Sequence, residues 1–98
     1  MSTREDQGAA TTVVVGSRVG LHARPAAIVA RAVGSLDATV RLSKDGAAPV
    51  DASSPLFIMT LGAKQGDEVL VQAEGPGAAD AVQRIAALIA QDLDADDH

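Results

Sequence analysis

The hydrophobic and polar positions along the chain predict seven short elements. Strands are expected where β-branched or apolar residues cluster or alternate with polar ones, at residues 11–17, 36–43, 47–51 and 67–74. Helices are expected where apolar residues recur every three or four positions, at residues 22–34, 53–62 and 78–91. The order βαββαβα, with an Asp-Gly hairpin turn at 45–46, predicts an α+β fold in which three helices cover one face of a four-stranded antiparallel sheet.

The two ends of the chain differ in composition from its middle. Residues 1–10 are polar and predict a disordered leader, and residues 11–91 hold the pattern of a single domain. Residues 92–98 form an acidic tail whose four aspartates carry most of the formal net charge of -5. We expect this tail to be a solvated end that aids solubility.

Composition excludes several classes of protein. The chain has no cysteine, which excludes disulfides and thiolate metal sites. Residues 11–91 contain seven basic and seven acidic residues, so the basic excess of a nucleic-acid-binding protein is missing. No secretory signal pattern and no apolar run of membrane-spanning length are present. These features predict a cytoplasmic monomer that binds no nucleic acid and does not insert into a membrane.

His22 is the residue with the most chemical promise, because the pattern after it predicts that it lies at a helix N-terminus. The first N–H groups of a helix have no acceptor within it, and the helix dipole adds positive charge, so such an end binds anions. Arg24 adds a planar cation suited to phosphate oxygens, and Pro25 fits a first turn, where its missing N–H is not needed. The positive surroundings disfavour protonation of the ring and leave a neutral nucleophile. We therefore expect His22 to accept a phosphoryl group that the helix start, at Ala23 and Arg24, helps to bind.

These residues also have other interpretations. A lone histidine at a helix start is more often a capping or surface residue, so this structural role stays open. No general base is evident for Ser17, Ser53 or Ser54, and no phosphate-binding loop of the GxxxxGKS or GxxxxGKT type is present. The only other histidine is His98, so neither a metal site nor a cofactor is expected.

The stretch GLHARPAA, residues 20–27, resembles the active-site motif of the histidine-containing phosphocarrier proteins (HPr) of the bacterial sugar phosphotransferase system. Residues 53–75 resemble the same family in their TLG and AEG sequences, so the similarity spans about residues 12–90. The resemblance implies an open-faced β-sandwich and phosphorylation of His22 on Nδ1 by enzyme I, which takes the group from phosphoenolpyruvate. It also implies that Arg24 attends the phosphohistidine and that IIA domains of sugar permeases receive the group. Such a protein is a relay and not a stand-alone catalyst.

Ser54 has two possible roles. It matches the position of a regulatory serine in many Gram-positive members of the family, but here Ser53 precedes it and Pro55 follows it. Proline restrains the backbone of the preceding residue, which changes the shape that a kinase would meet. A Ser-Pro pair is also favoured at a helix start, so we interpret Ser54 as an N-cap in preference to a regulatory site.

Apolar side chains close to the expected site predict a docking surface. On the short helix Ile58 and Leu61 can face the core together, which turns Phe57 and Met59 outward. The alternative is that Phe57 covers the core. The residues expected to dock partners are Ala27, Leu56, Phe57 and Met59.

Three functions remain open at this point. The first is a phosphoryl carrier of the sugar system, with enzyme I, IIA domains and regulatory proteins as partners. The second is a carrier of the same fold in a nitrogen-related branch or with a dihydroxyacetone kinase. The third is a regulatory binding domain that transfers nothing, and the presence of His22 with Arg24 argues against it.

Overall fold

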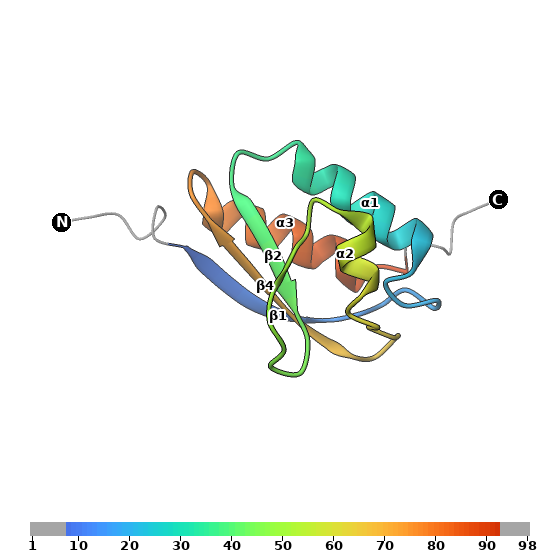
Figure 1. The fold of residues 1–98 in the computed structure, drawn as a ribbon. Coiled ribbons are helices and arrows are strands. Elements are labelled where there is room, and N and C mark those ends of the chain that lie inside the picture. The colour runs from blue at the N-terminus through green and yellow to red at the C-terminus, as the bar shows by residue number, and fades with distance from the viewer. Residues whose placement is uncertain (1–7, 93–98) are drawn as a thin grey trace.

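The structure is a computed structural model that describes residues 8–92, and these fold in the order βαββαβα (Figure 1). The strands are β1 (Ala9–Val14), β2 (Thr39–Ser43), β3 (Val50–Asp51) and β4 (Glu68–Glu74). The helices are α1 (Ala23–Gly34), α2 (Pro55–Met59) and α3 (Ala78–Ala90). The predicted order of elements is therefore confirmed, and residues 93–98 of the acidic tail lie outside the described residues.

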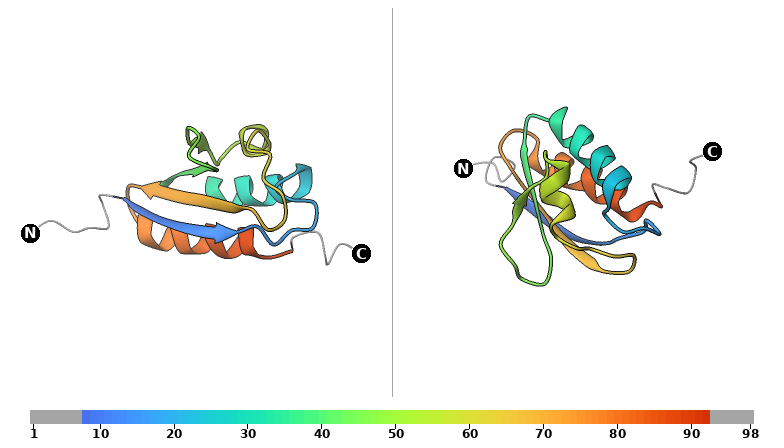
Figure 2. Two further views of the ribbon diagram at one scale, coloured as in Figure 1. Left: turned by 90° about the horizontal axis from the view of Figure 1, so that it is seen from below. Right: turned by 45° about the vertical axis from the view of Figure 1, so that its right-hand side comes forward.

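The four strands form one antiparallel sheet in the order β1-β4-β2-β3. Alternate residues of the two central strands are buried, as the period of two requires: Val69, Val71 and Ala73 in β4, and Val40 and Leu42 in β2. Among residues 8–92, no helix covers the other face of the sheet (Figure 2). This arrangement confirms the α+β open-faced sandwich. The strand β3 lies at an edge of the sheet, as Pro49 directly before it predicted.

The three helices build the second layer. The apolar stripe of α3, which includes Val82, Ile85 and Ile89, is buried and packs mainly on β1 and β4 (Figure 2). The helix α1 lies beside α3 and also packs against α2 (Figure 1). Because Phe57 is exposed, the hydrophobic core of the described residues has no aromatic ring and consists mainly of Val, Ile, Leu and Ala side chains, with Pro25 also buried.

The bounds of β1 and β2 differ from the sequence prediction. The strand β1 begins at Ala9, so Ala9 and Ala10 pair with the end of β4 although they were assigned to the leader. It ends at Val14, because the chain then turns toward α3. The strand β2 begins at residue 39 and not at 36, because the N–H groups of Ser35 and Leu36 donate to carbonyls of the last turn of α1.

The β2–β3 hairpin contains the expected turn but less strand than expected. Asp45 and Gly46 have φ values of 55° and 77°, as a tight hairpin turn with two left-handed residues requires, and the Ala47 N–H donates to the Lys44 carbonyl at 3.0 Å. Pro49 has no N–H, and pairing is limited to Val50 and Asp51. Among residues 8–92, no helix has the length and apolar character needed to cross a lipid bilayer.

Candidate functional site

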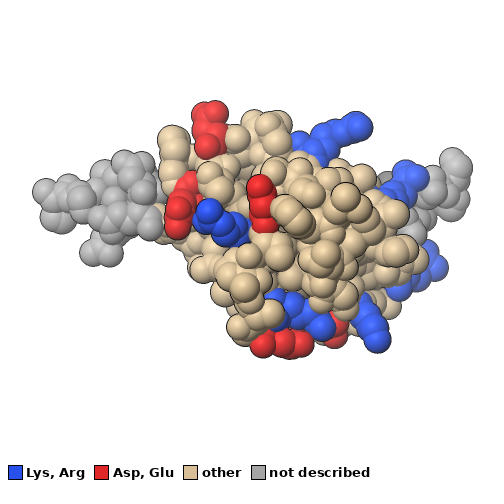
Figure 3. Space-filling view, in the orientation of Figure 1, with Lys and Arg blue, Asp and Glu red and all other residues tan. Residues whose placement is uncertain are grey.

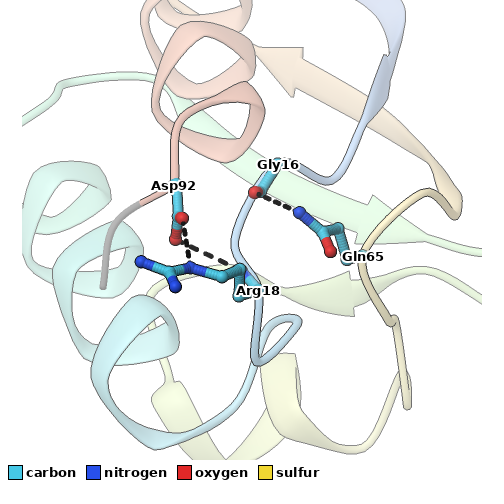
Figure 4. Close-up of polar contacts among 4 residues, drawn as sticks. All are labelled: Gly16, Arg18, Gln65 and Asp92. Carbon is cyan, nitrogen blue, oxygen red and sulfur yellow. Dashed lines mark hydrogen bonds and ion pairs between the residues drawn. The ribbon is translucent and has the colours of Figure 1, made fainter. Parts of the chain in front are cut away.

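The loop that leads to His22 is held by backbone hydrogen bonds from two neighbouring segments. The Gly16 N–H donates to the Ile89 carbonyl of α3 at 3.0 Å, and the Leu21 N–H donates to the Ala63 carbonyl at 2.9 Å. The Gln65 side-chain amide donates to the Gly16 carbonyl at 3.2 Å (Figure 4). The β1–α1 loop therefore rests on the end of α3 on one side and on the α2–β4 loop on the other.

Two glycines make this close contact possible. A methyl group at Gly16 would overlap the carbonyl oxygen of Ala90, and one at Gly20 would overlap that of Ala63. Gly20 also has a φ of 73°, a left-handed conformation that favours glycine. At Gly16 and Gly20 the neighbouring backbone therefore leaves no room for a side chain.

Arg18 and Asp92 join the same loop to the end of the described chain. The Asp92 carboxylate accepts the Arg18 Nε–H at 2.9 Å and the Arg18 backbone N–H at 3.2 Å (Figure 4). The sequence interpretation assigned Asp92 to the solvated tail, whereas its carboxylate contacts a residue 74 positions earlier. Asp92 thus takes part in the folded domain.

His22 occupies the N-cap position of α1, as the sequence predicted. Its backbone is extended, with φ -96° and ψ -161°, and its carbonyl accepts the first helical hydrogen bond from the Ala26 N–H at 2.8 Å. Its side chain is exposed and makes no capping hydrogen bond. The N–H groups of Ala23 and Arg24 precede that first bond and have no acceptor within the helix, and Pro25 has no N–H.

The first turn of α1 carries a basic side chain. The first turn of α1 contains no acidic residue, and Arg24 is exposed in that turn. On the face shown in Figure 3, Lys and Arg side chains gather at the end of the molecule where α1 begins, and Asp and Glu side chains lie elsewhere. The structure therefore places the exposed His22 at the N-terminus of α1, with the exposed Arg24 two residues later in the first turn.

The helix α2 begins as predicted, at Pro55 with Ser54 as its N-cap. The Ser54 hydroxyl accepts the Phe57 N–H at 3.4 Å, so the capping role is confirmed. Leu56 and Phe57 are 70% and 51% exposed, which rules out the alternative that Phe57 closes the core. Met59, which was expected to face outward, is instead half-buried and packs against the core.

Among residues 8–92, no group of three or more His, Cys, Asp or Glu side chains is placed to hold a metal ion.

The model of a protein family described as the PTS HPr component phosphorylation site matches residues 9–91. The chain belongs to the HPr family of phosphocarrier proteins.

Individual relatives agree with this assignment. The chain is 40% identical over 82 residues to the phosphocarrier protein HPr of Streptomyces coelicolor, which covers 84% of the chain and 88% of the relative. It is 31% identical over 85 residues to the phosphocarrier protein NPr of Escherichia coli, which covers 87% of the chain and 94% of the relative. The crystal structure of an HPr from Bacillus anthracis matches with a TM-score of 0.79 at 32% identity, over 84% of this chain and 96% of that one.

The support of the site in this HPr-family chain was not visible in the sequence. The sequence motif located His22 and Arg24, but nothing in it pointed to the contacts of Ala63 or to the pairing of Arg18 with Asp92. Contacts through a backbone carbonyl leave no trace in residue type, and one opposite-charge pair cannot be selected among many from a single sequence. The only local signal was the pair of glycines, Gly16 and Gly20, which often mark close backbone approach.

Proposed function

We propose that this HPr-family chain carries a phosphoryl group on Nδ1 of His22. Enzyme I, loaded from phosphoenolpyruvate, is the proposed donor, and IIA domains of sugar permeases are the proposed acceptors in the cytoplasm. The chain acts in this scheme as a relay between enzymes and holds no cofactor. Its affiliation with a phosphocarrier family and the geometry at the start of α1 both support the proposal.

The observation that carries the proposal is the uncapped start of α1. A histidine at an N-cap usually leaves its ring free to turn, and here the ring is exposed with no hydrogen bond to the helix. The N–H groups of Ala23 and Arg24 remain directed toward that end, where the helix dipole attracts anions. A phosphoryl group on the ring would therefore meet donors that no side chain of the helix occupies.

The chemistry requires little from the protein itself. In the accepting step, the Nδ1 lone pair of His22 forms a bond to phosphorus while the bond from phosphorus to the donor enzyme breaks. Three equatorial oxygens carry the charge during transfer, and the helix N-terminus with the Arg24 guanidinium stabilises that charge. In the donating step, the bond from Nδ1 to phosphorus breaks while phosphorus bonds to the acceptor. The site must therefore hold the group without burying it.

Partner docking is proposed for the exposed apolar surface around the site. Leu56 and Phe57 of α2 are exposed, and Ala27 is exposed on α1, the helix against which α2 packs. Exposed apolar side chains beside a transfer site fit the modest, short-lived contacts of a carrier that serves several partners. Met59 contributes less than expected, since it is half-buried.

A second candidate is transfer in another phosphotransferase branch, either nitrogen-related or linked to a dihydroxyacetone kinase. The similarity to NPr, at 31% identity, favours keeping this candidate. The chemistry at His22 would be the same, and only the partners would differ. A domain that binds partners without transfer is disfavoured because the acceptor histidine is present.

The experiment is phosphorylation by purified enzyme I and phosphoenolpyruvate, followed by mapping of the group. We expect an acid-labile phosphoryl group on His22 and none on the His22→Ala variant. The Ser54→Ala variant is the control, because it alters the start of the other helix, α2, and leaves His22 in place. Equal labelling of the parent and of His22→Ala would contradict the proposal, and acceptor assays with IIA domains of each branch would separate the two candidates.

A further inference from the structure

The chain makes a tight turn at residues 17–20, directly before Leu21 and His22. The Gly20 N–H donates to the Ser17 carbonyl at 2.9 Å and closes the turn. The two residues at its corner, Arg18 and Val19, are both exposed. Packing against the core therefore does little to fix the corner of the turn that leads to the site.

The carboxylate of Asp92 contacts this corner instead. Its Oδ1 accepts the Arg18 backbone N–H at 3.2 Å, and its Oδ2 accepts the Arg18 Nε–H at 2.9 Å (Figure 4). Both oxygens of one carboxylate thus bind the main chain and the side chain of the same residue. The other loop N–H groups that contact distant segments donate to backbone carbonyls, and they belong to Val15, Gly16 and Leu21.

The position of Asp92 is set by α3, because it is the second residue after that helix ends. The Gln91 N–H between them donates to the Leu88 carbonyl at 3.1 Å, and Ile89 is fully buried. The carboxylate is therefore attached to a well-packed element. An exposed ion pair alone contributes little, so the bond from the Arg18 backbone N–H is the contact that constrains the turn.

We propose that Asp92 is a positioning residue for phosphoryl transfer, which fixes the turn at Arg18 and so orients the backbone that presents His22. The proposal rests on the proposed function of His22. Asp92 acts only through Arg18 and does not contact the phosphoryl group. Alignment of the ring with phosphorus matters, because a misplacement of about 1 Å can cost about 100-fold in rate. Without the carboxylate, a smaller fraction of molecules presents the ring in the reactive arrangement.

Transfer from phosphorylated enzyme I in a single turnover tests this role, with the maximal rate and the half-saturating concentration of the chain measured separately. We expect Asp92→Ala to lower the maximal rate about three- to tenfold, the equivalent of one net hydrogen bond, and to leave the half-saturating concentration unchanged. Asp92→Asn should recover about half or more of the lost rate, because its amide oxygen can still accept the Arg18 N–H.

Asp80→Ala is the matched control, and it should transfer at the parental rate. It also removes a carboxylate from α3 that lies beside an arginine, since Asp80 Oδ2 is 3.6 Å from Arg84 Nε. Asp80 is in the first turn of the helix, at the end opposite to Asp92. All rates are compared at a temperature where circular dichroism shows every variant to be folded, so that a loss of stability alone does not lower them.

Three outcomes of the rate measurement would overturn the proposal. The first is a maximal rate in Asp92→Ala equal to that of the control. The second is an effect confined to the half-saturating concentration, which would make Asp92 a docking residue. The third is an equal loss in Asp92→Ala and Asp92→Asn, which would assign the effect to the charge of the carboxylate and not to its bond with the Arg18 N–H.

Nuclear magnetic resonance follows the turn without any transfer. Asp92→Ala should shift the Val19 amide signal and the ring C–H signals of His22, Asp92→Asn should restore most of the shift, and Asp80→Ala should leave these signals in place. Unchanged His22 signals in Asp92→Ala would overturn the positioning. If no form of the chain is phosphorylated, the proposed function fails, and these signals alone decide whether Asp92 orients His22.

Discussion

The helices α1 and α2 both begin at a polar residue that is followed closely by a proline, yet their first turns are completed differently. At α2 the Ser54 hydroxyl accepts the Phe57 N–H, and Pro55 occupies the first helical position. At α1 the His22 side chain caps nothing, and proline comes third, at Pro25. The N-cap side chain of α2 therefore bonds to its own helix, whereas the N-cap side chain of α1 does not.

This difference separates stability from function within one fold. A good N-cap is worth about 1 kcal/mol, so α1 forgoes stability that α2 has. The start of α1 is instead held from outside, through backbone bonds of Gly16 and Leu21 to two other segments. External support keeps the helix start in place without a side-chain cap from His22.

The largest expected effect comes from breaking that external support at Gly20. Gly20→Ala should destabilise the protein by about 3 kcal/mol or more, because the residue has a positive φ and its methyl group would overlap the Ala63 carbonyl. Gly62→Ala is the matched control, since Gly62 also has a positive φ, 63°, but nothing lies within 4 Å of its added methyl group. It should cost only about 1 kcal/mol. Chemical denaturation measures both, and equal losses would show that the loop contact contributes little.

The next effect concerns the guanidinium at the open helix start. Arg24→Ala should slow phosphoryl transfer by about 10- to 100-fold, because a hydrogen bond to a charged group contributes about 1.5–3 kcal/mol. The fold should be unaffected, since Arg24 is exposed. Arg84→Ala, which removes an exposed arginine from α3, is the control for charge alone. A transfer rate in Arg24→Ala that equals the control would show that the helix end suffices without the side chain.

Substitutions at the two N-cap residues, His22 and Ser54, test the comparison further. His22→Ser should stabilise the protein by about 1 kcal/mol, because a hydroxyl can accept an N–H of the first turn that the imidazole leaves open, and it should abolish labelling. Ser54→Ala should cost about 0.5–1 kcal/mol, at the low end of the range because its hydrogen bond is long at 3.4 Å. Thermal unfolding measures both changes. A loss of stability in His22→Ser would show that the ring itself supports the helix.

The sequence predicted the order of elements and both helix starts, because these depend on local signals. Apolar period, a Ser-Pro pair and an Asp-Gly turn each act within a few residues, and each appears in the structure where it was expected. Strand ends were predicted less well. Whether Ala9 joins the sheet depends on its partner in β4, 64 residues away, and a single sequence carries no record of that partner.

The candidate site also has parts that local sequence predicted and parts that it did not. His22 and Arg24 were predicted from a contiguous motif, whereas the segments that hold them were not. Leu21 is bound by a carbonyl from residue 63, and Arg18 by a carboxylate from residue 92. Contacts of this kind arise from the three-dimensional path of the chain, and so the sequence predicted the reacting group but not its support.

The smallest expected effect is a pH dependence in the segment that braces α1. The Asp67 carboxylate accepts the Lys64 N–H at 2.9 Å and lies 3.5 Å from the Lys44 ammonium. The hydrogen bond from Lys64, with a smaller contribution from the charge of Lys44, lowers the pKa of Asp67 below its ordinary value. A turn formed around Asp67 thus holds the Ala63 carbonyl that Leu21 contacts.

The corresponding group at α2 is Asp51, whose pKa is lowered by hydrogen bonds from the N–H and hydroxyl of Ser53. A lowered folded-state pKa means that the stabilisation is fully present above the ordinary Asp value of about 4 and is lost as the pH falls through the lower folded value. The loss of stability on acidification from pH 6 should therefore be smaller in Asp67→Asn than in the parent. Because asparagine keeps an acceptor oxygen, the change should be modest.

Amide hydrogen exchange distinguishes the start of α1 from the start of α2. Asp67→Asn should reduce the protection of the Leu21 N–H, and Asp51→Asn should not. Equal protection of Leu21 in both variants would show that the start of α1 is held without help from the charge on Asp67.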